Sequence, residues 1–379
     1  MIALARKTLA YEWRRFLPVV LAMCFAGVLL IVQAALVLGI FGTAAIYVKA
    51  SSADIWAGFP GTQSVNYGHA ISADVESHLR MDPDVTRVEP YEWVDGEWRS
   101  SAQGTGNVSV YLSGISTRDD AMMFARILPA DLRAQLREPG AVIVDSADLD
   151  TLGVSLQNNR AWINGKAVRV VAAQPGLRGL GGVNVLASLD TARAIAGTDP
   201  HEGSTYFVAG LRSPDLADRV RDRLSASMGQ ATPVEFWTAP QFASRSQQYW
   251  LFDTGAGIAV LFMAVIVCFV GAVITNQSFA SVVAGSVREY ATLNALGAGR
   301  YALARVVFEQ ALLIGGVGML LAAAFSTVVL LIAQTQRVPV QLTPMVILGC
   351  VALVAVMAML SSIMAVRSVV RSDPSLLLR

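Results

Sequence analysis

The sequence predicts a membrane α-helical protein with four transmembrane helices and a large extracytoplasmic α+β domain inserted between helices 1 and 2. Four stretches of the chain carry no charged residue, and a long charged region separates the first from the other three. A membrane core about 30 Å thick needs about 20 apolar helical residues, so each stretch is long enough to span it. The stretches are Leu17–Val48, Thr254–Val287, Gln310–Gln336 and Val338–Val366.

The distribution of positive charge predicts the orientation. Between Lys49 and Trp250 there are 18 Lys and Arg against 23 Asp and Glu, whereas the rest of the chain is net positive. Because positively charged loops stay in the cytoplasm, both termini are expected inside the cell (inner) membrane. The large domain is then in the periplasm or extracellular space. The residues behind this prediction are Arg6, Lys7, Arg14, Arg15, Arg288, Arg300, Arg305, Arg367, Arg371 and Arg379.

The first two apolar stretches are longer than a membrane requires. As a helix, Leu17–Val48 would reach about 48 Å at about 1.5 Å per residue. The excess is either apolar linker or a stalk that continues into the outer domain. The predicted segments are a cytoplasmic amphipathic segment at 1–16, helix 1 with its stalk at 17–48, the outer domain at 49–249, stalk and helix 2 at 250–287, a cytoplasmic coupling loop at 288–304, helices 3 and 4 at 305–336 and 343–367, and a cytoplasmic tail at 368–379.

The outer domain mixes strands and helices, as one body or as two lobes with 140–197 inserted. Asn164-Gly165 predicts a tight hairpin turn, and the four glycines of Gly176–Gly182 favour a mobile loop. Strands are expected at Val108–Ile115, Ala141–Val144, Arg160–Ile163, Ala167–Ala172, Val183–Leu186 and Thr205–Val208. Helices are expected at Ser72–Arg80, Asp119–Ile127, Asp190–Ile195 and Pro214–Met228.

Side chains that carry chemistry are sparse. Cys24, Cys268 and Cys350 all lie in apolar stretches, so we expect them to pack as small apolar residues rather than to form disulfides. His69 and His78 lack a helical metal-ligand spacing. No nucleophile or acid/base cluster is evident, so no catalytic residue, metal or cofactor site is expected, and no nucleic-acid partner. No span has an ionisable residue in its middle, which argues against a proton-driven pump.

The loop after the second apolar stretch is the most informative motif. It begins with Arg288 and Glu289 and places Leu293 and Leu296 on one helical face before Gly297. A helix this short is not stable alone in water. We therefore expect it to dock on another protein.

This loop and the end of the chain resemble the permeases of the MacB/FtsX superfamily of ABC transporters, as in MacB-type exporter permeases and DevC/HrtB-like half-transporters. The loop is similar to the family's R-E-x-x-x-L-x-A-L-G-A segment, with Asn294 where Arg or Lys is often found. The chain's last residues look like the family's D-P-x-x-x-L-R ending with one extra leucine. The matching residues are Arg288, Glu289, Leu293, Ala295, Leu296, Gly297 and Ala298, and those of Asp373–Arg379.

The resemblance implies a homodimer of this chain with a separate dimer of ABC ATPase subunits, which bind the ATP and Mg. It leaves open whether a periplasmic adaptor and an outer-membrane channel take part. It also implies porter-like and sabre-like lobes in the outer domain. The chain has no G-x-x-x-x-G-K-[ST] phosphate loop of its own. The residues that the resemblance assigns to ATPase coupling are Arg288, Glu289, Leu293, Leu296, Gly297 and Arg300.

Two functions fit these observations. One is the permease subunit of an ATP-driven ABC exporter or extractor, in which the long helices 1 and 2 transmit ATPase closure to the periplasmic domain (mechanotransmission). The alternative is an FtsX-like transmembrane regulator that activates a cell-wall hydrolase. The size of the inserted domain favours the exporter. A membrane-anchored enzyme is disfavoured, because the sequence shows no reactive cluster.

Overall fold

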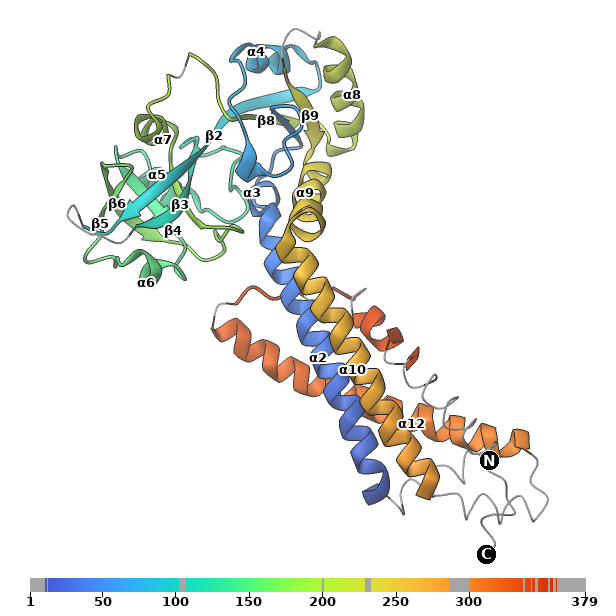
Figure 1. Cartoon of the computed structure of the whole chain (residues 1–379). Coiled ribbons are helices and arrows are strands. Elements are labelled where there is room, and N and C mark those ends of the chain that lie inside the picture. Colours follow the sequence, from blue (N-terminus) through green and yellow to red (C-terminus); the bar gives the residue numbers. More distant parts are fainter. Residues whose placement is uncertain are drawn as a thin grey trace, which may run out of the picture. The chain divides into compact units, whose positions relative to one another are not determined.

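The computed structural model (Figure 1) divides into two compact units, which we call the membrane unit (Met1–Gly39 and Ile258–Arg379) and the outer domain (Ile40–Gly257). The structure describes residues 11, 13–101, 107–199, 201–228, 233–285, 300–336, 338–341, 343–344, 347–353, 355–356 and 359.

Long apolar helices form the described part of the membrane unit. They are α2 (Trp13–Gly42), α10 (Gly255–Gly285) and α12 (Arg300–Thr335). Among the described residues, three helical stretches are long and apolar enough to cross a membrane: Phe16–Lys49, Gly255–Ser278 and Leu312–Thr335. The fourth predicted span, 343–367, lies largely outside the described residues, so the four-helix count and the inside location of both termini stay predictions.

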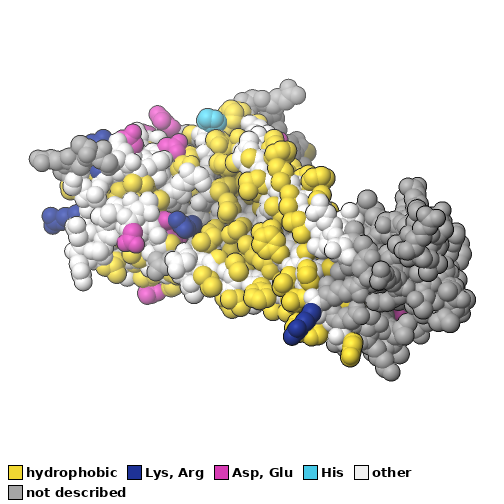
Figure 2. All heavy atoms as spheres, turned by 60° about the horizontal axis from the view of Figure 1, so that its bottom comes forward, with side chains coloured by type: hydrophobic (Ala, Val, Ile, Leu, Met, Phe, Trp, Pro, Cys, Tyr) yellow, Lys and Arg dark blue, Asp and Glu magenta, His cyan; other side chains and the backbone are white. Residues whose placement is uncertain are grey.

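Many large apolar side chains of these helices face outward, as lipid-facing residues do. Phe262, Phe269 and Leu320 are examples, and Figure 2 shows the broad hydrophobic surface that side chains of this kind form on one face. Such a surface is far more apolar than the exterior of a water-soluble protein, which keeps its exposed apolar patches small. This agrees with a membrane location.

Small residues let α2 and α12 pack closely. An ideal Cβ on Gly27 would lie 2.7 Å from the Cβ of Ala322, and one on Gly318 would lie 2.9 Å from the Cβ of Met23. Close helix approach in lipid relies on such residues. The polar Gln33 donates a hydrogen bond to the carbonyl of Val260 at 3.4 Å, which joins α2 to α10.

The outer domain is built around strand β2 (Val85–Arg99), which belongs to two sheet regions. Its first half pairs with β8, and its second half pairs with β3 and β5. The described strands follow the order β3-β7-β4-β6-β5-β2-β8-β1-β9. The other strands are β1 (Ile55–Gly58), β3 (Val108–Ile115), β4 (Ala141–Val144), β5 (Arg160–Ile163), β6 (Lys166–Ala173), β7 (Val183–Ser188), β8 (Tyr206–Leu211) and β9 (Glu235–Thr238).

Strands β9, β1, β8 and the first half of β2 form an antiparallel sheet that is buried on both faces. Successive side chains point to opposite faces, so Ile55 and Ala57 lie in one cluster, with α4 (Asp74–Met81) and α8 (Ala217–Ser227), while Trp56 lies in the other. The second cluster holds Trp56, Tyr91, Tyr206, Trp237 and Phe242, and we call it the aromatic core.

The remaining strands close into a small barrel. The order β3-β7-β4-β6-β5-β2 is completed by a pairing between β3 and β2, and β3–β7 and β4–β6 are parallel pairs. Aliphatic side chains with Trp98 fill its interior. The segment 140–197 supplies β4 to β7, while β2 and β3 come from earlier in the chain. Short helices α5 (Ala130–Gln135), α6 (Leu149–Leu152) and α7 (Leu189–Ala196) lie between barrel strands or after them in the chain.

Most sequence-predicted elements of the outer domain are confirmed. Asn164 and Gly165 have φ of 48° and 79°, as a two-residue turn with two left-handed residues requires. The helix predicted at Asp119–Ile127 is wrong, because the chain forms turns there. The reason is that Met122, Met123 and Phe124 are all buried, and three consecutive residues cannot share one face of a helix.

Candidate functional site: the junction of the flanking helices with the outer domain

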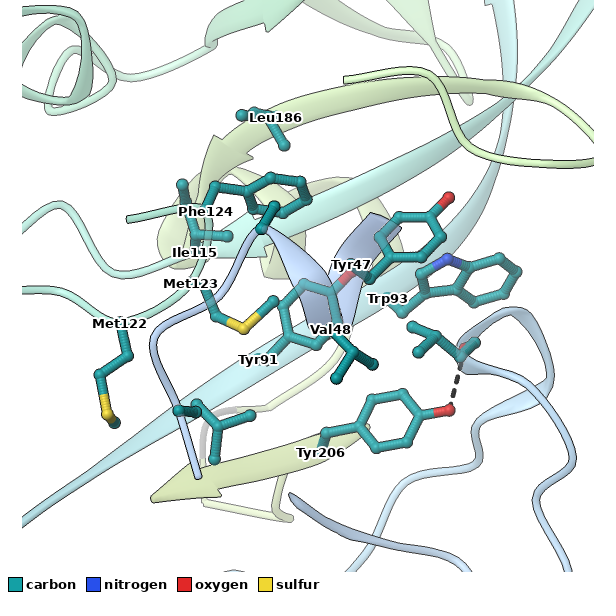
Figure 3. Packing of buried hydrophobic residues seen from close by; sticks show 14 of the residues in the cluster. Tyr47, Val48, Tyr91, Trp93, Ile115, Met122, Met123, Phe124, Leu186 and Tyr206 are labelled. Carbon is teal, nitrogen blue, oxygen red and sulfur yellow. Dashed lines mark hydrogen bonds between the residues drawn. The ribbon is translucent and has the colours of Figure 1, made fainter. Parts of the chain in front are cut away.

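Two segments flank the outer domain: α2 with its continuation to Lys49 is the first flanking segment, and α9 (Ala239–Gln248) with the chain up to α10 is the second. The first flanking segment ends inside the aromatic core. After α2 the chain continues as η1 (Thr43–Ala45) and α3 (Ile46–Lys49). Tyr47 and Val48 are buried, and Figure 3 shows them among Tyr91, Trp93 and Phe124. The end of this helix is therefore part of the outer-domain core.

A loop at 122–126 holds the chain directly after α3. The amide of Ser52 donates to the carbonyl of Met122 at 3.0 Å, and the amide of Arg126 donates to the carbonyl of Ala50 at 3.0 Å. The hydroxyl of Ser51 also donates to the Met122 carbonyl, at 3.2 Å. Within this loop Phe124 has φ of 55°, an uncommon conformation for a bulky residue. The loop fastens α3 through both backbone and side chain.

The second flanking segment also enters the aromatic core. Helix α9 (Ala239–Gln248) begins with a capping box between Thr238 and Gln241, which satisfies two free backbone N–H groups. Phe242 of α9 stacks on Trp237, with ring centroids 4.7 Å apart. Helix α9 packs against η1 and α3. Both flanking segments therefore meet each other and the same core.

The two flanking segments differ in continuity. After α9 the chain forms a π-helix, η4 (Tyr249–Asp253), and then breaks at Thr254, whose ψ of 143° is extended. The Thr254 amide donates to the carbonyl of Tyr249 at 3.2 Å, and its hydroxyl donates to the carbonyl of Trp250. Isolated π-helical turns are often found at functional sites. The second segment therefore contains a defined bend before α10, whereas Phe16–Lys49 is one helical stretch.

The glycine-rich loop Gly176–Gly182 touches both flanking segments. A Cβ on Gly179 would collide with the hydroxyl of Tyr47, and one on Gly181 would lie 3.0 Å from the Tyr111 hydroxyl and 3.4 Å from the ring of Trp250. Glycine is required for such close approach. The loop thus connects the barrel, where β7 follows it, to both helices.

This loop is fastened rather than free, contrary to the mobile loop that its glycines favour. Its Leu177 is buried, and the Leu177 amide donates to Oδ2 of Asp145 at 2.7 Å. The side-chain amide of Asn66 donates to the carbonyl of Leu180 at 2.9 Å. These bonds offset the entropy that the glycines lose on ordering.

Three buried polar atoms at this loop have no hydrogen-bond partner among the described residues. They are the hydroxyl of Tyr47, the indole nitrogen of Trp93 and the amide oxygen of Asn66. Each unsatisfied atom costs about 1–3 kcal/mol.

The coupling residues predicted from the sequence mostly lie outside the described residues. This applies to Arg288, Glu289, Leu293, Leu296 and Gly297, whereas Arg300 begins α12. Their coupling role therefore stays a prediction. The sequence reasoning missed the junction, although an aromatic residue at the very end of the first apolar stretch, Tyr47, was a usable signal.

His69 packs edge to face on Phe59, and the Nε2 of His78 is 2.8 Å from the hydroxyl of Ser227, so the two histidines have different neighbours. The described residues contain no group of three His, Cys, Asp or Glu that could hold a metal ion. All three cysteines are free. Trp93 and Trp98 are packed in cores.

Residues 261–374 match the family of FtsX-like permease C-terminal domains. This stretch is therefore similar to the C-terminal domain of FtsX-like permeases. The matched range includes the predicted coupling loop and the apolar stretches that follow it. A search of curated proteins found no match.

Solved structures are similar to about half of this chain at low identity. They include the extracellular domain of the noncanonic ABC-type transporter YknZ from Gram-positive bacteria (12% identity, TM-score 0.34, 49% of this chain and 100% of that one). The periplasmic region of MacB from Actinobacillus actinomycetemcomitans has 10% identity and a TM-score of 0.36, over 52% of this chain and 94% of that one. A putative permease domain from Porphyromonas gingivalis has 11% identity and a TM-score of 0.31, over 49% and 88%.

Proposed function

We propose that this chain is the permease subunit of an ATP-driven ABC exporter or extractor that works by mechanotransmission. Two copies of the chain pair with a separate ABC ATPase, which binds the ATP and Mg. Closure of the ATPase moves helices 1 and 2, and the outer domain changes shape in response. The substrate is pushed onward outside the membrane.

The burial of both flanking segments in one core is the observation that carries this proposal. The first helical stretch runs for 34 residues, Phe16–Lys49, and would extend about 50 Å against a membrane core of about 30 Å. Its Tyr47 and the α9 residue Phe242 are both fully buried in the aromatic core. Because protein interiors are close-packed, a displacement of either helix end has to move the core with it.

The glycine-rich loop extends this connection to the barrel. It contacts Tyr47 of α3 and Trp250 of η4, and it is tied to Asp145 at the end of β4. Movement of the helix ends therefore bears on two strands of the barrel, β4 and β7. The whole outer domain then responds, and not only the part next to the ends of the two helices.

At the cytoplasmic end, the proposal assigns ATPase contact to the 288–304 loop. Leu293 and Leu296 provide the apolar face that docks, Arg288 and Glu289 provide charged contacts at its start, and Gly297 ends the helix. Arg300 follows at the first residue of α12. This loop lies inside the range matched by the FtsX-like family.

The test is an assay of the full-length chain reconstituted with its ATPase in lipid nanodiscs. Leu296→Asp should abolish stimulation of the ATPase by the permease, whereas Asn294→Asp, which adds the same charge off the leucine face, should keep it. Tyr47→Ala should keep ATPase binding but lose transport. Coupling free energies of about 1–3 kcal/mol correspond to effects of about 5–150-fold.

Two results would overturn the proposal. One is a Tyr47→Ala protein that transports as well as the wild type although its ATPase remains coupled. The other is an ATPase that responds only to a cell-wall hydrolase and to no small molecule or lipid, which would make the chain a regulator instead.

A further inference from the structure

The outer domain has a small open pocket beside η4. Its volume is about 260 Å³. The chain directly after β1 forms one side, and the π-helix residue Tyr249 forms another. The lining residues are Phe59, Pro60, Gly61, Thr62, Gln63, Tyr67, His69 and Tyr249.

Two aromatic pairs form the walls of this pocket. Phe59 and His69 meet edge to face at 5.5 Å, and Tyr67 and Tyr249 meet edge to face at 5.5 Å. Tyr67 also stacks on Trp250 at 6.2 Å. Although it lies in this aromatic cluster, Tyr67 keeps 47% of its surface exposed. An aromatic side chain held open in this way offers apolar surface to a ligand.

Apart from the two tyrosines, His69 is the lining side chain of the pocket that can ionise. None of the lining residues is Asp, Glu, Lys or Arg, and burial raises the pKa of Tyr67 above its ordinary value, so its hydroxyl stays neutral. The Thr62 hydroxyl already donates to the carbonyl of Phe59 at 2.7 Å, and the Gly61 amide donates to Glu235 at 2.8 Å. The pocket therefore suits an apolar group rather than an ion or a polar peptide.

Position along the chain identifies the source of that apolar group. Tyr249 precedes Gly255, the first residue of the candidate span, by only six residues. Tyr and Trp gather where a span meets the membrane surface. Tyr249, Trp250 and the exposed Phe252 are such residues. The pocket wall thus belongs to the segment that enters the outer leaflet.

We propose that this pocket binds the end of an acyl chain from a lipid of the outer leaflet. Its volume is below the range of about 300–1,000 Å³ that encloses a drug-sized molecule, so a chain end fits where a whole ligand does not. The conclusion that such a lipid is the transported substrate rests on the proposed function. The conclusion that lipid occupies the pocket does not depend on it. Because Tyr249 lies on η4, movement of the second flanking segment would open or narrow the pocket and release the chain.

Site-specific photo-crosslinking in intact membranes tests the occupant. A photoreactive amino acid at Gln63, which is exposed and lines the pocket, should form adducts with phospholipid that mass spectrometry detects. The same amino acid at Phe262, in the exposed apolar face of α10, should also form them. At Met81, which is 79% exposed at the end of α4, it should not. A Gln63 yield no higher than that at Met81, or an adduct with a protein, would overturn the proposal.

Two substitutions of the exposed Tyr67 separate binding from folding. Tyr67→Ser removes the aromatic ring and should reduce the yield of the Gln63 lipid adduct by about fivefold or more, where tenfold would correspond to about 1.4 kcal/mol. Tyr67→Phe keeps the ring and should keep the yield. An undiminished adduct in Tyr67→Ser would contradict the assignment. If Gln63 crosslinks lipid but ATP hydrolysis never reduces this adduct, lipid binding in the pocket is supported and the exporter function is contradicted. If transport proceeds without a Gln63 lipid adduct, the exporter function is supported and lipid binding in the pocket is contradicted.

Discussion

The ring of Tyr47 meets the ring of Phe124 edge to face, with centroids 6.3 Å apart and an interplanar angle of 82°. This contact joins the end of the first flanking helix to a loop whose backbone is left-handed at Phe124. A bulky residue in that conformation costs of order 1–3 kcal/mol and persists only where the surroundings enforce it. Here full burial of both rings enforces it, so the loop and the helix end hold each other.

Substitutions at Tyr47 should separate packing from hydrogen bonding. Tyr47→Ala removes a fully buried ring and should lower the free energy of unfolding by about 3–5 kcal/mol. Tyr47→Phe removes a hydroxyl that has no partner among the described residues, so its stability should stay within about 1 kcal/mol of the wild type or rise. Thermal unfolding of the detergent-solubilised chain measures both. A loss in Tyr47→Phe as large as that in Tyr47→Ala would show that the hydroxyl is bonded.

The bend before α10 depends on Gly257 and not on Gly255. A Cβ on Gly257 would collide with the carbonyl of Leu251, whereas one on Gly255 would meet nothing within 4 Å. Gly255→Ala should therefore gain up to about 1 kcal/mol, as alanine does in helices. Gly257→Ala should lose about 1–3 kcal/mol through overpacking and raise hydrogen exchange in 249–253. Equal effects of the two substitutions would mean that the π-helix does not depend on this contact.

Much of the outer domain could be predicted because local signals agree with the fold. Val108–Ile115 and Arg160–Ile163 are strands with the predicted bounds, since β-branched and aromatic residues favour a half-buried pleated surface. Asn164-Gly165 forms its turn because both residues tolerate positive φ. The helices predicted at Asp190–Ile195 and Pro214–Met228 follow from apolar residues at helical spacing and appear as α7 and η3–α8.

The junction could not be predicted, because long-range packing determines it. Nothing local in Tyr47 indicates that Phe124, far along the chain, will cover its ring. The predicted stalk and helix 2 at 250–287 give no local sign of a break at Thr254, which only its hydrogen bonds to the carbonyls of Tyr249 and Trp250 reveal. The closing of the barrel depends on β2 pairing with both β3 and β5, which strand periodicity does not specify.

Packing of α2 on α12 gives a prediction for the membrane unit. Gly27 lies against Ala322, with 2.7 Å from its ideal Cβ to the Ala322 Cβ, whereas Gly316 has open space at its Cβ position. Gly27→Leu should push the helices apart and lower stability by about 1–3 kcal/mol. Gly316→Leu should leave it unchanged. Thermal aggregation in detergent measures both variants. A stable Gly27→Leu protein would show that α2 and α12 do not pack through this site.

Acid should weaken the ion pair between α8 and the loop before β2. Both nitrogens of the Arg223 fork donate to the Asp82 carboxylate at 2.7 Å, and these bonds lower the pKa of Asp82 below its ordinary value. A depressed carboxyl pKa contributes stability that is complete above the unfolded value, about 3.9, and is lost as pH falls through the folded value.

Arg223→Ala should therefore unfold at a lower temperature than the wild type at pH 7. The difference should shrink as pH falls below about 4, where Asp82 is protonated first in the unfolded chain and, at still lower pH, in the folded protein. Arg219→Ala, which removes an exposed arginine of the same helix, should track the wild type at every pH. The measurement is the midpoint temperature of unfolding of the wild type and of both variants across a pH series. A gap between Arg223→Ala and the wild type that stays constant into acid would mean that Arg223 acts through packing of its apolar stem rather than through the charge of Asp82.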